Sequence, residues 1–149
     1  MKYKDKNIPE ITLKFKSGIV EKTSITCSED SYNVLKKFYD EDTIELTETF
    51  VVLYLNMNNK TLGWQKVSQG GIAGTVVDIR LIFATALKCA ASSIILSHNH
   101  PSGNTTPSKI DLSITRKMIE GGKLLEIKIL DHIIISDSTY YSCADNNDL

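Results

Sequence analysis

The most constraining feature of this sequence is a pair of histidines at the end of an apolar run. His98 and His100 follow residues 93–96, a run that is typical of a buried strand because it is short, apolar and preceded by a helical pattern. In extended chain, alternate side chains share a face. The two imidazoles are therefore expected to point at one place while Asn99 faces away, which gives half of a metal site.

The residues that follow predict the other half. Pro101, Gly103 and Pro107 interrupt regular structure, and Ser108 followed three residues later by Asp111 is typical of a helix start with a capping serine. A compact loop would return the Asp111 carboxylate to the histidines. Two nitrogens and one oxygen, with a fourth position left for water, suit a catalytic zinc ion. The same ligands with open positions also suit iron(II).

These residues resemble the metal-binding signature of the JAB/MPN (JAMM) metalloprotease domain, His98-x-His100-Pro101 followed by Ser108 and Asp111. In its longer form, His-Asn-His-Pro-Ser-Gly and Pro-Ser-x-x-Asp, the pattern looks like the bacterial RadC branch of that superfamily. The likeness runs from about residue 48 to about residue 144, and it includes residues 53–56, 67–70, 130–134 and 140–142. A match at so many separated positions is far more specific than a lone His-x-His.

The resemblance implies roles for two more residues. From the residues alone, Glu48 is an ordinary surface acid at a strand end. In the RadC branch a Glu-x-Phe pattern begins this strand, and Glu48 with Phe50 matches it, so the resemblance makes Glu48 the acid that carries the proton of the attacking water. Ser108 is a helix N-cap by its position, and the family's serine at this point steadies the bound water or the oxyanion. Both interpretations of Ser108 can hold together.

The order of the predicted elements indicates the fold class. We expect a β-hairpin within residues 11–26, with its turn at Ser17-Gly18, then helices at residues 30–39, 79–90 and 109–121, and strands at residues 49–55, 61–68, 126–130, 132–136 and 140–142. Asp78 is expected to cap the second helix, and Gly121-Gly122 to stop the third. This order gives an α/β domain with a mixed sheet flanked by helices. The resemblance implies a JAB/MPN-like, cytidine-deaminase-like, three-layer arrangement.

We expect one domain over residues 1–149, with an N-terminal hairpin and helix in residues 1–40 and the RadC-like core in residues 41–149. The glycine-rich segment 69–75 lacks the Gly-Lys-Ser/Thr ending of a phosphate loop. Its glycines are more simply explained by unusual dihedral angles or a close approach to a neighbour. His132, next to Asp131, is expected beside the ligands or in the core, because a fourth protein ligand would close the open position.

Composition narrows the function classes. The net charge of −1 and a pI near 6.3 give no global positive field for nucleic acid. Three widely separated cysteines predict free thiols in a reducing compartment, and the start of the chain lacks the apolar core of a signal peptide. We therefore expect a cytoplasmic protein with no membrane association. The sequence leaves the oligomeric state open.

The sequence predicts a zinc-dependent hydrolase, a JAMM-type metallopeptidase or isopeptidase, that cleaves an amide bond in a protein or peptide. The alternative is a DNA-repair-associated protein, acting as a nuclease or as a non-enzymatic nucleic-acid binder, since the RadC family carries a repair label; the charge does not support it. A zinc deaminase would need His-x-Glu with Pro-Cys-x-x-Cys, and a serine hydrolase a Gly-x-Ser-x-Gly elbow. The sequence contains none of these.

Overall fold

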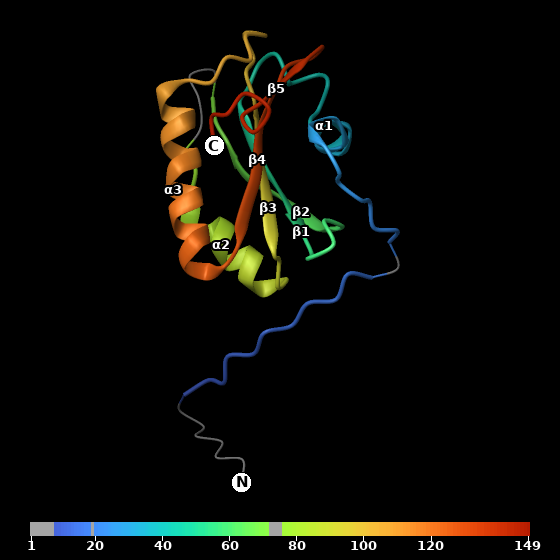
Figure 1. Cartoon of the computed structure of the whole chain (residues 1–149), viewed down its shortest axis with the longest axis vertical. Helices are drawn as coiled ribbons and strands as arrows, with labels where there is room; N and C mark the ends of the chain where they lie inside the picture. Colours follow the sequence, from blue (N-terminus) through green and yellow to red (C-terminus); the bar gives the residue numbers. More distant parts are fainter. Residues whose placement is uncertain (1–7, 19, 72–75) are drawn as a thin grey trace.

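The computed structural model describes residues 8–18, 20–71 and 76–149 (Figure 1). Its elements, in chain order, are α1 (Ser28–Leu35), η1 (Lys36–Phe38), β1 (Thr49–Leu55), β2 (Thr61–Gln69), α2 (Ile79–Lys88), β3 (Ser93–Asn99), α3 (Lys109–Leu125), β4 (Lys128–Ile135) and β5 (Tyr140–Ser142). The strands form one sheet in the order β2-β1-β3-β4-β5. Only β3 and β4 pair in parallel among these strands, so the sheet is mixed, as predicted.

Two apolar cores cover the two faces of the sheet. On one face, α2 and α3 pack on strand side chains, with Ile82 and Met118 fully buried. On the other face, α1 and the connector to β1 pack on the alternate strand residues, with Leu35 fully buried. Strands β1 and β3 are buried along their whole length, because each face of the central sheet meets a helix layer. The predicted three-layer α/β arrangement is confirmed (Figure 1).

The connection from β3 through α3 to β4 positions the polar residues of the loop between β3 and α3. Parallel strands need a crossover, and α3 supplies it. The carboxyl end of β3 therefore lies beside the N-terminus of α3. In open α/β sheets this end of the strands is where ligands bind.

The β-hairpin expected within residues 11–26 is wrong for the described residues. Residues 8–18 and 20–27 contain no strand, and a single bridge pairs Ser24 with Lys60; Ile19 lies outside the described part of the chain.

The two strands expected at 126–130 and 132–136 are a single strand, β4. Asp131 does not break it, because its buried carboxylate accepts hydrogen bonds from Ser142 Oγ (2.5 Å) and Ala144 N (2.9 Å).

Helix α3 does not stop at Gly121-Gly122 but continues to Leu125, where Glu126 takes the left-handed conformation at φ 57°. The two glycines permit close packing instead. A Cβ on Gly121 would lie 2.8 Å from the Phe83 ring, and one on Gly122 would lie 2.2 Å from the carbonyl oxygen of Ile127. The other predicted elements are confirmed, including the Asp78 cap of α2, and all three cysteines are free.

Substituting Gly122→Ala should destabilise the domain. A methyl group would overlap the Ile127 carbonyl, a backbone group that cannot move aside cheaply, and this cost should exceed the helix-propensity gain of up to about 1 kcal/mol. We expect a net loss of about 1–3 kcal/mol in urea unfolding followed by circular dichroism. The exposed α3 variant Glu120→Ala is the control and should stay within about 0.5 kcal/mol. A Gly122→Ala protein as stable as this control would contradict the packing argument.

Candidate metal centre

Strand β3 carries both histidines to one point. The Nε2 atoms of His98 and His100 lie 2.9 Å apart, and the His98 side chain is 1% exposed. Because His98 is the penultimate strand residue and His100 follows the strand directly, their side chains share a face. The expected convergence of the two rings is present.

Asp111 reaches the histidines from the first turn of α3. Its Oδ1 lies 3.2 Å from His98 Nε2 and its Oδ2 3.2 Å from His100 Nε2. The same carboxylate accepts a hydrogen bond from Ser108 N (2.7 Å), while Ser108 Oγ accepts one from Asp111 N (3.1 Å). This is the predicted capping box. Asp111 therefore caps the helix and faces the histidines at once.

The protonation of Asp111 and His100 depends on the contacts that these residues make with each other and with His98. Burial opposes ionisation of Asp111, but hydrogen bonds from His100 and His98 outweigh it and hold the pKa of Asp111 well below its usual range. The hydrogen bond with Asp111 in turn raises the pKa of His100, against the opposing effect of burial. In the absence of another cation, the pair therefore favours a proton between His100 and Asp111.

Glu48 joins the group from the residue before β1. Its Oε1 lies 3.9 Å from His98 Nε2. One ligand atom from each of Glu48, His98, His100 and Asp111 lies within 4.8 Å of the others. Two carboxylates and two imidazole nitrogens at this spacing can hold a metal ion.

Asn99 fixes the chain on both sides of Glu48. Its Oδ1 accepts a hydrogen bond from Thr49 N (2.7 Å), and its Nδ2 donates to Thr47 O (2.9 Å) and to Ile44 O (2.7 Å). Asn99 faces away from the histidines, as predicted, and it is fully buried. Glu48 itself is held by a further hydrogen bond, from Gly70 N to Glu48 O (2.8 Å). No local pattern predicts this role of Asn99, because its partners lie about fifty residues away along the chain.

His132 lies behind His98 and outside the group, as expected. The ring is fully buried, and its Nε2 lies 2.7 Å from His98 Nδ1. Its Nδ1 lies 2.6 Å from Thr115 Oγ1, which donates to the main-chain oxygen of Asp111 at 2.8 Å. Complete burial holds the pKa of His132 well below the usual histidine value, so the ring is neutral. Thr115 was not anticipated from the sequence.

The direction of these hydrogen bonds assigns the imidazole tautomers. The Thr115 hydroxyl gives its proton to Asp111 O, so it accepts from Nδ1–H of His132, whose Nε2 then accepts from Nδ1–H of His98. On the other ring, His100 Nδ1–H donates to Asn104 O at 2.7 Å. Both Nδ1 positions hold a proton, and both Nε2 atoms point into the group, where the proton shared by His100 Nε2 and Asp111 can be replaced by a metal ion. This orientation of histidine nitrogens is the one that metal ligands adopt.

The structure describes Ser108 and part of the glycine-rich segment 69–75. Ser108 is exposed and lies against Asp111, and its hydroxyl keeps a proton to donate. Of the glycine-rich segment, residues 72–75 lie outside the described residues. Within the described ranges, no helix is long and apolar enough to cross a bilayer.

The chain is similar to proteins of one family over most of its length. Residues 25–148 match the model of the RadC-like JAB domain. The UPF0758 protein of Flavobacterium johnsoniae is 43% identical over 127 residues, which cover 85% of this chain and 54% of the relative. That of Methanosarcina mazei is 41% identical over 124 residues, covering 83% and 53%. This chain spans about half the length of these relatives, and it belongs to the RadC-like JAB domain family.

Proposed function

We propose that this domain is a zinc-dependent hydrolase that cleaves an amide bond in a protein or peptide, with His98, His100 and Asp111 as the metal ligands. The observation that carries the proposal is the pair of Nε2 atoms 2.9 Å apart. With both Nδ1 positions engaged as donors, the two Nε2 atoms and two carboxylates share a small space. These groups need a cation among them, either the shared proton or a metal ion in its place.

The donor set fits zinc. Ligands at about 2.0–2.1 Å from a tetrahedral ion lie about 3.3 Å from one another. The two Nε2 atoms lie 2.9 Å apart, and each lies 3.2 Å from one Asp111 oxygen, His98 from Oδ1 and His100 from Oδ2. Zinc bound here would act as a Lewis acid on the scissile carbonyl and lower the pKa of a water in its fourth position. Iron(II) accepts the same donors, and metal analysis of protein purified without chelator separates the two.

Glu48 is proposed as the general base. It lies at the edge of the group, 3.9 Å from His98 Nε2, which is farther than the Asp111 oxygens, and Asn99 holds the main chain of the residues before and after it. From there its carboxylate takes a proton from the attacking water and passes it to the leaving amine. Ser108 donates a hydrogen bond from its hydroxyl group to the oxyanion that develops on the substrate carbonyl.

Replacing Glu48 with Gln should abolish hydrolysis without removing the metal. The amide cannot take a proton, so the rate on a library of quenched-fluorescent peptides should fall by about 10²–10⁴, while zinc content by mass spectrometry stays near one per chain. The exposed acid Glu45, three residues earlier, provides the matched control Glu45→Gln, which should leave both quantities unchanged.

The double variant His98→Ala/His100→Ala should lose the zinc. Unchanged zinc content in that variant would remove the proposed site.

The hydrogen bonds that run from Thr115 through His132 to His98 should raise the affinity of the site for zinc. His132→Phe removes the acceptor for His98 Nδ1–H, and Thr115→Val removes the group that orients His132, so each should weaken zinc binding by about 10–100-fold in competition with a chelating dye. Thr85→Val is the control, because Thr85 makes the same hydroxyl-to-carbonyl bond, to Leu81 on α2, away from the site. Zinc affinity equal to wild type in both variants would mean that these hydrogen bonds do not orient His98.

Zinc affinity should fall as the pH is lowered. Metal must displace the proton that the His100–Asp111 contact favours. Since the pKa of His100 is raised above 6.5, the loss should begin above pH 6.5 and approach about tenfold per pH unit below the raised value. Asp111 stays ionised throughout this range because its pKa is lowered. Titrations at fixed free zinc between pH 8 and pH 5.5 test this, and a flat profile would contradict it.

A further inference from the structure

An extended arm, defined here as residues 8–16, precedes the first helix of the domain. Its odd-numbered residues Ile11, Leu13 and Phe15 alternate with Thr12 and polar neighbours. Ile11 is 96% exposed and Leu13 70% exposed. Figure 1 shows the arm, in blue, running away from the sheet. An apolar row with period two is the pattern of a strand whose one face is covered.

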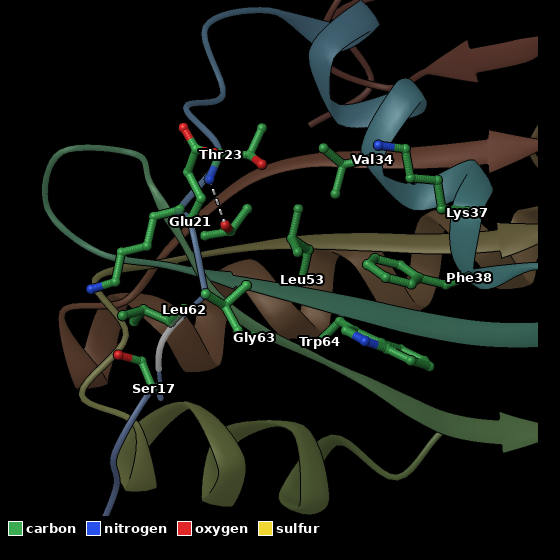
Figure 2. Close-up of a pocket in the computed structure, with 13 residues that line it drawn as sticks. Ser17, Glu21, Thr23, Val34, Lys37, Phe38, Leu53, Leu62, Gly63 and Trp64 are labelled. Atoms are coloured by element: carbon green, nitrogen blue, oxygen red, sulfur yellow. Dashed lines mark hydrogen bonds between the residues drawn. The ribbon is translucent and has the colours of Figure 1, made fainter.

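The same chain has an apolar groove beside an uncovered sheet edge. Strand β2 is one of the two edge strands, and the groove of about 410 Å³ lies between β2, the α1–η1 segment and residues 17 and 20–23. Figure 2 shows Trp64 and Phe38 along it, with Leu53 at its floor. The Trp64 and Phe38 rings stack at 4.3 Å, yet Trp64 remains 47% exposed. Apolar surface of this kind marks an interaction site.

The groove has the geometry of a slot for one more strand. Trp64 pairs with Leu53 of β1, whose side chain lies in the core under α1, so Trp64 stands on that face of the sheet. A strand added along β2 would place every second side chain on the same face, beside Trp64. The chain begins such pairing at one point, where Thr61 N donates to Thr23 O (2.9 Å) and the Ser24–Lys60 bridge forms. Among the described residues, pairing on this edge does not continue along β2.

We propose that the occupant is the arm of a second copy of this chain, so that two copies exchange arms and each arm adds a strand to the other's β2 edge. Residues that follow the arm line the groove of their own chain, Ser17 (Figure 2) and Val20, and the arm points outward from there in Figure 1. Reciprocal exchange covers two apolar rows and two edges with one two-fold interface. This inference goes beyond the proposed hydrolase function and does not depend on it.

The full chain should be a dimer of about 33 kDa, twice its 16.6 kDa, by light scattering after gel filtration at micromolar concentration. The arm variant Ile11→Ser/Leu13→Ser should be a monomer with an unchanged circular dichroism spectrum. The matched control Thr12→Ser/Lys14→Ser alters the other face of the same arm and should remain a dimer. The groove variant Trp64→Ser should also be a monomer, because the arm and the groove are the two sides of one contact.

The single tryptophan distinguishes exchange from an arm that folds back on its own chain. In an exchanged dimer the Trp64 emission should shift to the red on dilution, in step with dissociation, and the arm variant should show the red-shifted spectrum at every concentration. A wild-type monomer at all concentrations overturns the proposal, whether or not its Trp64 emission responds to the arm substitutions. A dimer that survives Ile11→Ser/Leu13→Ser overturns it as well.

Discussion

The site depends on the alternation of side chains at the end of β3. Three consecutive residues point to alternate faces of the sheet: His98 and His100 face the N-terminus of α3, and Asn99 faces the other way. Asn99 bonds the main chain on both sides of Glu48, so the position of the proposed base is tied to the strand that carries two of the proposed ligands. Because β3 is central, paired with β1 on one side and β4 on the other, this segment has little freedom to shift. A slip of one residue would exchange the two faces and separate all four groups.

Asp111 connects that strand to α3 in two ways. Directly, its carboxylate meets both histidines while closing the capping box with Ser108. Indirectly, its main-chain oxygen accepts from Thr115, one turn along the helix, and the chain of bonds returns through His132 to His98. The result is a closed ring of contacts between the end of one strand, the start of one helix and the neighbouring parallel strand. Such supporting contacts hold ligand geometry more tightly than the ligands could alone.

The predictable parts of this structure are those fixed by near neighbours in the chain. The shared face of His98 and His100 follows from strand geometry, and the capping box follows from a three-residue spacing. The helix end at Gly121-Gly122 was wrong because the reason for these glycines is contact with Phe83 and Ile127, which no local pattern reveals. The N-terminal hairpin was wrong because alternation tells which face of a segment is apolar and not which edge it joins. Asn99 and Thr115 were missed for the same reason: their partners come from other elements.

The apolar core is part of the candidate site, because it decides the protonation of His132. A histidine in water changes charge near neutral pH and exchanges its proton between two nitrogens. Buried completely, His132 loses the charged form, and its two remaining polar contacts fix which nitrogen carries the proton. Phe50 of β1 supports both rings, stacked on His98 at a centroid distance of 5.9 Å and edge-on to His132 at 5.6 Å. Burial of a polar ring costs free energy unless its hydrogen bonds are made. Here both are made, and they leave the lone pair of His98 directed at the one place where two carboxylates and a second imidazole converge.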